Sequence, residues 1–357
     1  MRSPKIKVAL LLSGGVDSSV VLALLKQNAD YDLTAFYLKI WLEDETQFLG
    51  TCPWEEDLAF ARSVCAQFAV PLEIVPLQTE YYDRVVSYTI QELKIGRTPS
   101  PDIFCNERVK FGAFYEAIGK DFDFIASGHY AQVEHHEKFS VLCRAKDEIK
   151  DQTYFLAHIS QAQLRRCLFP IGHLLKSEVR DLAANFDLLS STRKDSQGIC
   201  FLGKIKYQDF VAHYLGEKPG RIVDITTRKE LGTHLGYWFY TLGQRKGLKL
   251  HGGPWFVVKK DIHTNSIYVA HEECLTQYSR AKFKVTSCHW INDFEEYDAL
   301  YVKVRHGKKL LGARLEYYSH SSAEVFISEI DSGLADGQFC VFYLGKVCLG
   351  SGMIELF

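Results

Sequence analysis

The chain has 357 residues, of which 47% are hydrophobic and 24% are charged, so we expect two or three domains with ample length to bury a core. A formal net charge of −2 excludes a global electrostatic attraction to nucleic acid, so any RNA binding would depend on local basic patches. No apolar run is long enough to span a membrane, so we expect a cytoplasmic protein with reduced thiols. The ten cysteines include no CxxC pair, so we expect no zinc or iron–sulfur centre and no metal site built from the protein alone.

The first predicted strand leads through a glycine turn into a helix. Residues 7–12 form a short apolar run without alternation, which is typical of a parallel strand covered on both faces. Gly14 and Gly15 follow, and two positions without a Cβ let the backbone turn sharply and approach a ligand. Residues 17–19 (DSS) are predicted to cap the helix, whose first amides and positive dipole end suit an anion. The run LLLSGGVDSS therefore predicts a phosphate-binding loop, although such turns are also common structural features. It is not the GxxxxGK[ST] loop, because no lysine follows the glycines.

Strands and helices alternate after this loop. Strands are predicted at residues 33–41, 70–77 and 122–127, and helices at 55–69, 82–95 and 106–118. This order predicts an α/β fold with a doubly wound, mostly parallel sheet, in which ligands bind beyond the carboxyl ends of the strands. The loops after Leu12, Trp41, Leu77 and Ser127 should then share one rim. Gly128 lies on that rim, either because a nucleotide needs the backbone close or as an ordinary turn.

Two cysteines stand in stretches that suit chemistry. Cys105 lies in TPSPDIFCN, where prolines hold the chain extended and Asn106 is predicted to cap the next helix, so that the helix dipole would favour the thiolate. Asp102 is a candidate base three residues earlier. Cys200 lies in the polar, glycine-punctuated loop RKDSQGICFLG, which would end the α/β region. The alternative for Cys105 is a buried structural cysteine, and the two thiols could cooperate only if the fold brings both loops to one site.

Beyond Cys200 the composition changes, and two further domains are predicted. A helix is expected at 207–215, followed by short strand-like pieces and a basic, glycine-rich stretch, YTLGQRKGLKLHGG. From about Phe283, alternating segments separated by regular turn signals favour a small antiparallel barrel or sandwich. We therefore expect an α/β domain at 1–205, a small central domain at 206–280 and a barrel at 281–357. Five residues form the most basic edge of the barrel, which could equally be a solvated surface: Arg305, His306, Lys308, Lys309 and Arg314.

Six motifs in order resemble those of the tRNA-specific 2-thiouridylases, members of the ATP pyrophosphatase (PP-loop) superfamily. They are SGGVDSS, TPSPDIFCN, SGHYA, KDQTYFL, DSQGICFLG and GYWFYTLGQRKGL. The resemblance covers most of the chain and is weakest in the final barrel. It implies that ATP, with Mg²⁺, adenylates the oxygen on C2 of the wobble uridine of a tRNA, and that sulfur then displaces AMP. The implied partners are the tRNAs for Glu, Gln and Lys and a protein sulfur donor, with the enzyme acting as a monomer.

The resemblance also implies roles for individual residues. Cys200 would carry a persulfide, Cys105 would be the nucleophile that releases its sulfur, by a disulfide with Cys200 or by attack on the persulfide, and Asp102 would be the general base. ATP would contact Leu11, Leu12, Ser13, Gly14, Gly15, Val16, Asp17, Ser18, Leu38 and Gly128. The flipped target base would contact Ser100, Pro101 and Asp102, and the rest of the tRNA would contact His129, Lys150, Asp151, Gln152, Arg305, His306 and Gln338. Three positions depart from the family: Ser100 replaces a usual Asn, Leu38 a usual Met and His306 a usual Tyr.

Two other functions fit part of the pattern. A related adenylating ligase that acts on a small molecule would need neither Cys105 nor Cys200. A catalytically silent tRNA-binding protein would not need to keep Ser13, Asp17 and Asp102. The two cysteines together with the intact loop favour the thiolase.

Overall fold

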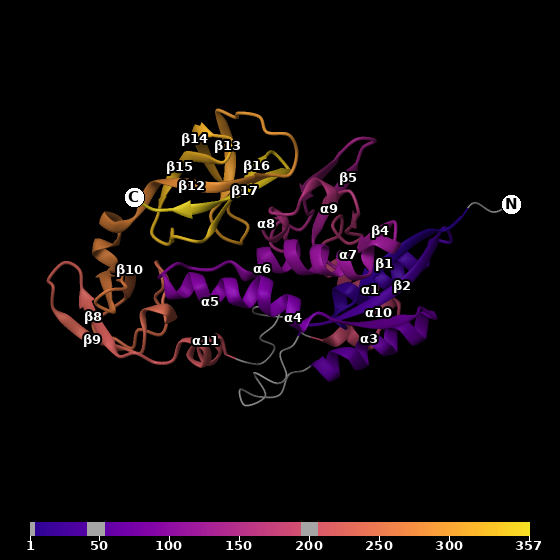
Figure 1. The fold of residues 1–357 in the computed structure, drawn as a ribbon, viewed down its shortest axis with the longest axis horizontal. Helices are drawn as coiled ribbons and strands as arrows, with labels where there is room; N and C mark the ends of the chain where they lie inside the picture. The colour runs from indigo at the N-terminus through magenta and orange to yellow at the C-terminus, as the bar shows by residue number, and fades with distance from the viewer. Residues whose placement is uncertain (1–3, 41–53, 194–205) are drawn as a thin grey trace.

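The computed structural model describes residues 4–40, 54–193 and 206–357. Figure 1 shows three parts: an α/β domain at the right, a central domain at the left and an antiparallel barrel above the long helical run that joins them. Within the described ranges, no helix is long and apolar enough to cross a membrane.

The first domain contains a five-stranded parallel sheet in the order β3-β2-β1-β4-β7. Its strands are β1 (Ile6–Leu11), β2 (Tyr31–Lys39), β3 (Leu72–Pro76), β4 (Phe124–Ala126) and β7 (Cys167–Leu168). In β1, Val8 and Leu10 belong to one hydrophobic core and Ala9 and Leu11 to another. The strand is therefore covered on both faces, as its unbroken apolar run predicts, and the doubly wound fold is confirmed.

Helices from different parts of the chain cover the two faces. On one face lie α1 (Val16–Lys26), α3 (Trp54–Phe68) and α10 (Lys176–Asn185), which contribute to the core of Val8 and Leu10. On the other lies a helical run made of α4 (Gln78–Tyr81), a π-helix (Tyr82–Val86), α5 (Ser87–Lys94), α6 (Pro101–Phe104), a π-helix (Cys105–Ala113) and α7 (Phe114–Ala117). The described part of this domain also holds four short helices: Gly119–Asp121, α8 (Thr153–Leu156), α9 (Gln161–Leu164) and Leu189–Thr192.

The second predicted helix of this run starts earlier than expected. It begins at Pro101 rather than at Asn106, because proline suits the first helical position, where its missing amide hydrogen costs no hydrogen bond. Cys105 follows in the same unbroken helix, and the Asn106 side chain donates to the Phe155 carbonyl at 3.1 Å instead of capping. The expectation that Asn106 caps a helix directly after Cys105 was therefore wrong.

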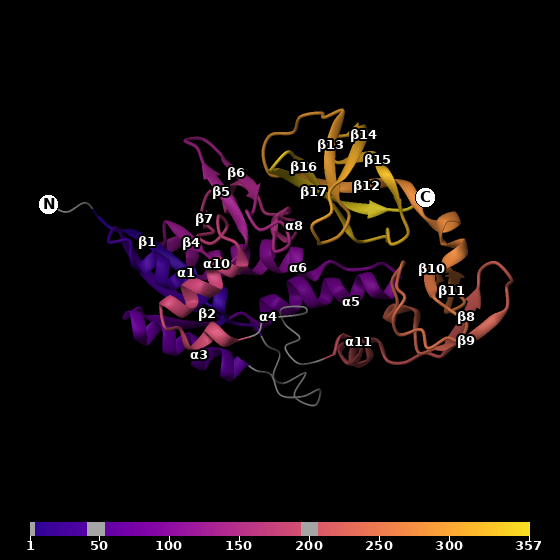
Figure 2. The same cartoon turned by 180° about the vertical axis from the view of Figure 1, so that it is seen from behind.

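The barrel is closed by six antiparallel strands, which confirms the predicted architecture. They are β12 (Arg280–Trp290), β13 (Ala299–Lys303), β14 (Leu311–Ser319), β15 (Ser322–Asp331), β16 (Phe339–Leu344) and β17 (Val347–Glu355). A hairpin of the first domain, β5 (Ala131–His135) and β6 (Ser140–Arg144), extends this sheet, because β6 pairs with β17. Figures 1 and 2 show the hairpin beside the barrel from opposite sides. One sheet thus ties the barrel to the α/β domain.

The central domain holds helix α11 (Tyr207–Leu215) and a four-stranded sheet in the order β10-β11-β8-β9. Its strands are β8 (Gly220–Asp224), β9 (Glu230–His234), β10 (Trp255–Asp261) and β11 (Ser266–His271), and short helices span Tyr237–Phe239 and Glu272–Tyr278. The chain between α5 and α6 runs between this domain and the barrel. There the Thr98 hydroxyl bonds that of Thr241 at 2.5 Å, and its amide donates to the Asp336 carbonyl at 2.7 Å. Both later domains therefore hold the segment that leads into α6.

Lys260 of β10 lies half-buried at this junction, where its ammonium donates to the Tyr240 carbonyl at 3.1 Å. Burial lowers the pKa of Lys260 from 10.5 to about 8, although the negative charge of Asp336 acts in the opposite direction. Between these two pKa values the folded protein binds fewer protons here than the unfolded chain, so this group makes stability rise with pH. In urea unfolding we expect the wild type to gain stability relative to Lys260→Met between pH 8 and 10. Parallel stability curves for the two proteins would contradict this assignment.

Candidate functional site

The glycine loop lies where the strand order of the parallel sheet reverses. The neighbours of β1 are β2 on one side and β4 on the other, and ligands of such sheets bind at this point, beyond the carboxyl ends of the strands. The loop after β1 and the turn after β4, which holds Gly128, therefore meet here. Leu38 lies near the end of the adjacent β2, half-buried against the core.

Gly14 and Gly15 shape the loop in different ways. Gly14 has a left-handed backbone (φ +75°), and a Cβ there would lie 2.1 Å from the Asp57 carbonyl oxygen of α3. Gly15 is the N-cap of α1 and offers no side-chain cap. The prediction that residues 17–19 cap the helix was wrong, because they lie inside its first turn, where the Ser18 and Ser19 hydroxyls donate back to the Gly15 carbonyl. The first amides of α1 are thus left uncapped by a side chain, as an anion site requires.

Gly128 packs directly on the start of α1. A Cβ at this position would lie 3.0 Å from the Ser18 amide nitrogen and 3.2 Å from the Asp17 carbonyl carbon. A larger residue would push the turn after β4 away from the loop. Gly128 therefore lets the turn after β4 pack closely against the backbone of α1. Its contact with adenosine stays a prediction.

Asp17 is the acidic residue of the loop, and two side chains from later in the sequence hold its carboxylate. The Lys176 ammonium lies 2.7 Å from Oδ1, and the Tyr130 hydroxyl donates to the same oxygen at 2.8 Å. Lys176 is the first residue of α10, and its backbone amide donates to Asp147 at 3.0 Å. Neither partner is predicted from the sequence. Tyr130 stood within a quoted motif, whereas nothing in the run HLLKSEVR distinguishes Lys176 from an ordinary helix-start lysine.

Arg193 connects the glycine loop to the segment that carries Cys200. Its guanidinium donates to the Gly14 carbonyl at 3.0 Å and to the Asp57 carboxylate at 2.7 Å. Residues 194–205 follow directly, so Cys200 lies outside the described residues. Arg193, the last described residue before that segment, contacts the glycine loop through its side chain.

Asp102 and Cys105 lie one turn apart in the helix that starts at Pro101. Cys105 is 1% exposed and packs in the hydrophobic core, whereas Asp102 is half-buried. The Ser100 amide donates to the Tyr88 hydroxyl at 3.3 Å just before the helix. The three predicted residues thus share one short stretch, in which the thiol is shielded from solvent.

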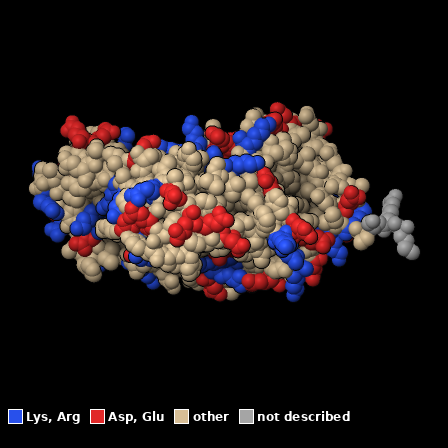
Figure 3. Space-filling view, turned by 90° about the horizontal axis from the view of Figure 1, so that it is seen from above, with Lys and Arg blue, Asp and Glu red and all other residues tan. Residues whose placement is uncertain are grey.

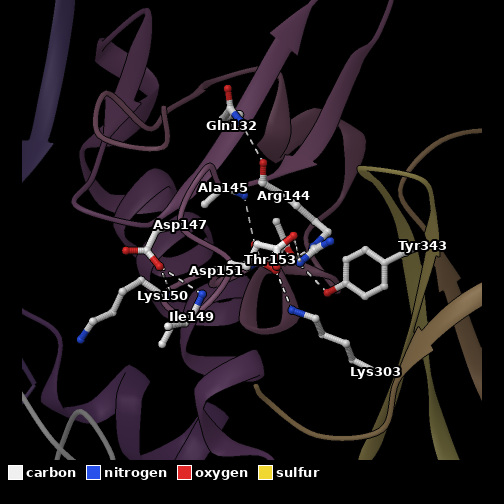
Figure 4. Close-up of polar contacts among 11 residues, drawn as sticks. Gln132, Arg144, Ala145, Asp147, Ile149, Lys150, Asp151, Thr153, Lys303 and Tyr343 are labelled. Carbon is white, nitrogen blue, oxygen red and sulfur yellow. Dashed lines mark hydrogen bonds and ion pairs between the residues drawn. The ribbon is translucent and has the colours of Figure 1, made fainter. Parts of the chain in front are cut away.

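Asp151 occupies a different position from the one that the sequence suggested. Its side chain is fully buried, as is that of Lys303 from β13, and the two charges lie 2.7 Å apart. Arg144 approaches the same carboxylate oxygen at 3.4 Å, while the Thr153 hydroxyl donates to the other at 2.9 Å (Figure 4). Neither carboxylate oxygen faces solvent, so a contact of Asp151 with tRNA would use its backbone, and this contact stays a prediction. The buried pair instead joins the α/β domain to the barrel.

The neighbours of this pair bring two other predicted tRNA segments together. His306 stacks on Phe155 with ring centroids 4.6 Å apart, so the barrel segment 305–306 lies against the helix that follows Gln152. Burial lowers the pKa of the His306 imidazole, with the Lys303 charge acting in the same direction. Arg305 pairs with Asp331 and stays half-exposed. Residues 150–152 and 305–306 thus form one continuous patch across the domain boundary.

The last two predicted tRNA contacts are buried polar groups. The His129 ring bonds the Ser127 hydroxyl through Nδ1 at 2.7 Å, and burial holds the pKa of His129 well below its usual value, so the ring is neutral. Gln338 directly precedes β16, and its buried side-chain oxygen has no hydrogen-bond partner within the described structure. Its contact with tRNA stays a prediction.

Comparisons with known proteins identify the family of the chain. Three family models match in order: a tRNA methyl transferase HUP domain at residues 6–204, a tRNA methyl transferase PRC-barrel domain at 208–271 and an aminomethyltransferase beta-barrel domain at 280–354. The tRNA-specific 2-thiouridylase MnmA of Parabacteroides distasonis is 47% identical over 98% of each chain. This chain belongs to the tRNA-specific 2-thiouridylase family. Two further members are MnmA 1 of Bacteroides thetaiotaomicron, 44% identical over 97% of this chain and 99% of that one, and MnmA of Porphyromonas gingivalis, 46% identical over 97% and 98%.

Among solved structures, the match to the U34-tRNA thiolase NcsA from Methanococcus maripaludis has a TM-score of 0.36. Its identity is 19% over 56% of this chain and 62% of that chain. The assignment to the 2-thiouridylase family rests on the full-length relatives.

Proposed function

We propose that this protein is an ATP-dependent tRNA-uridine 2-thiolase that acts on the wobble uridine. The observation that carries the proposal is the glycine loop with its uncapped helix start at the switch point, in a chain that matches named 2-thiouridylases over 97% or more of its length. The proposed partners are the tRNAs for Glu, Gln and Lys and a protein sulfur donor. The enzyme would act as a cytoplasmic monomer.

The residues of the loop fit ATP with Mg²⁺. The first amides of α1 are available to phosphate oxygens because Gly15 provides no side-chain cap, and the Asp17 carboxylate is the hard oxygen ligand that Mg²⁺ prefers. Leu38 and Gly128, at the ends of the strands on either side of β1, would lie along the adenosine. When bound, ATP supplies an adenylate leaving group in place of the uracil oxygen.

Asp102, Cys105 and Cys200 would then carry out the sulfur transfer. The terminal sulfur of a Cys200 persulfide attacks C2, its proton passes to Asp102, and AMP leaves with the bonding electron pair. The Cys105 thiolate attacks Sγ of Cys200, so the sulfur–sulfur bond breaks and the outer sulfur stays on the uridine. A dithiol reductant restores both cysteines from the resulting disulfide. The burial of Cys105 supports this scheme, since it keeps water from the reacting sulfurs.

The patch at residues 150–152 and 305–306 is the proposed tRNA-contacting surface, together with His129 and Gln338. Figure 3 shows basic and acidic side chains interspersed on the face with the barrel, so the attraction to tRNA must be local. Ser100 and Pro101, which precede Asp102, would contact the flipped base.

Lys150→Ala is expected to weaken tRNA binding and to reduce the slope of log Kd against log salt by about one, because one phosphate contact is lost. Lys138→Ala is the matched control, since Lys138 is exposed at the tip of the β5–β6 hairpin, away from the patch. Filter binding at several salt concentrations measures both. Equal slopes for Lys150→Ala and wild type would remove Lys150 from the tRNA surface.

The proposed function is tested with ATP, magnesium, a persulfide donor protein and unmodified tRNA. We expect tRNA that is retarded on a mercury-containing gel, with release of AMP and pyrophosphate. Cys200→Ser should abolish the retardation. Production of ADP, or consumption of ATP without tRNA, would refute the proposal.

A further inference from the structure

We propose that Tyr88 is a positioning residue that holds the segment Ser100–Asp102 in the geometry that the reaction needs. This inference rests on the proposed function, because these three residues are the ones that would contact the target uridine. Tyr88 lies on α5, outside all six motifs, and no residue near it in the sequence marks it for a role in the site.

The turn into α6 offers only one backbone hydrogen by which it can be held. Ser100 stands between Pro99 and Pro101, and proline has no amide hydrogen. Ser100 is also the N-cap of α6, where its side chain makes no capping hydrogen bond. The Ser100 amide instead donates to the Tyr88 hydroxyl at 3.3 Å. This bond therefore ties α5 to the stretch that leads directly into Asp102.

Aromatic and cationic neighbours fix the Tyr88 ring. Phe104, the residue before Cys105, is 3% exposed and packs edge to face against this ring, with centroids 4.5 Å apart. The Arg108 guanidinium lies 3.7 Å from the Phe104 centroid and 5.7 Å from the Tyr88 centroid, where the two rings attract its charge. Arg108 is itself held by a hydrogen bond to the Arg84 carbonyl at 3.1 Å. The Tyr88 hydroxyl thus has a fixed position.

The hydroxyl also keeps one protonation state. Burial raises the pKa of Tyr88 above its usual value, so the side chain stays neutral over the pH range in which the enzyme would be assayed. We therefore expect Tyr88 to hold the Ser100 amide equally well at each pH in that range. An acid or base in the reaction would behave differently, because its contribution changes with its protonation state.

Loss of this bond should affect the rate of the reaction more than the affinity for tRNA. Without the hydroxyl, the Ser100 amide loses its partner and the turn before Asp102 is held less firmly. A small misplacement of the base relative to ATP slows the chemical step, because that step depends on the alignment of the reacting atoms. Affinity for tRNA depends mainly on phosphate contacts elsewhere, which this change leaves in place.

The test compares Tyr88→Phe, which removes only the hydroxyl, with Tyr317→Phe. Tyr317 is the matched control, because its hydroxyl accepts from the Tyr297 amide at 3.3 Å within the barrel and its ring packs edge to face against Phe294. We expect Tyr88→Phe to lower kcat for AMP formation about tenfold at each pH from about 7 to 9. Its KM for tRNA and its affinity for α,β-methylene ATP in calorimetry should stay within about twofold of wild type. Tyr317→Phe should match wild type in all three measurements.

Three kinetic results would overturn the role of Tyr88. They are a wild-type kcat in Tyr88→Phe, a raised KM for tRNA with unchanged kcat, and a defect confined to one end of the pH range, which would make Tyr88 an acid or base.

Hydrogen exchange of the free protein, followed by mass spectrometry of peptides that contain Ser100, tests the tether without the reaction. The Ser100 amide should exchange about tenfold faster in Tyr88→Phe than in wild type and Tyr317→Phe. Equal exchange in all three proteins would overturn the proposal. If wild type forms no AMP with tRNA, the proposed function fails instead, and the exchange rates still decide whether Tyr88 holds Ser100.

Discussion

Cys105→Ser is expected to leave AMP formation within about threefold of wild type but to reduce thiolated tRNA by a factor of at least about 10³, as the loss of a covalent nucleophile does. The reason is that the glycine loop and Cys105 lie in different parts of the domain. The glycine loop, where we propose that ATP binds, lies at the switch point of the sheet, whereas Cys105 lies in the helix that starts at Pro101. Adenylation does not need the thiol, while release of sulfur from Cys200 does.

The matched control for this variant is Cys65→Ser. Cys65 is 4% exposed in the core on the other face of the sheet. Cys65→Ser therefore removes a buried thiol of the same kind at a position away from Cys105. Timed samples from one reaction, analysed for AMP and for retarded tRNA, separate the two steps. Equal loss of both in Cys105→Ser, with Cys65→Ser active, would refute the role of Cys105 in sulfur transfer.

Asp151→Ala is expected to lower the free energy of unfolding by about 3–5 kcal/mol, because it leaves the Lys303 ammonium buried without its carboxylate. Both side chains are fully buried, so solvent screens the pair little. Lys346→Ala breaks an ion pair of similar length with Glu134, but both of those groups are half-exposed or more, so solvent screens the pair and we expect a much smaller loss.

Urea unfolding of four proteins measures this effect: wild type, Asp151→Ala, Lys303→Met and the double variant. The double variant should be more stable than Asp151→Ala, because it no longer buries an unpaired charge. If Asp151→Ala is no less stable than Lys346→Ala, the buried pair does not join the two domains as described.

Much of the fold could be predicted from local pattern. The apolar run before Gly14 predicts a strand covered on both faces because burial leaves no polar alternation, and β1 has that environment. The boundaries of short helical stretches could not be predicted as well. One helix begins at Pro101, earlier than predicted, because proline is tolerated at the first helical position. The N-cap of α1 is Gly15 and not one of the residues after it, as had been expected.

What local pattern misses is long-range pairing. Asp17 meets Lys176, and Asp151 meets Lys303, across separations of 159 and 152 residues, and no local motif encodes either pair. The hairpin that extends the barrel sheet is another long-range pairing, since β6 of the first domain pairs with β17 near the end of the chain. In the candidate site, the sequence therefore identifies the loop and the cysteines, and only the fold shows the charges that surround them.

We propose that the glycine loop activates the same uridine that the cysteines thiolate. Mass spectrometry of nucleosides from digested tRNA, with AMP quantified in the same reaction, measures both products together. We expect one AMP for each 2-thiouridine formed at the wobble position, and no 2-thiouridine when ATP is replaced by α,β-methylene ATP. 2-Thiouridine formed without AMP, or AMP formed with persulfide donor and tRNA present but no thiolation, would contradict it.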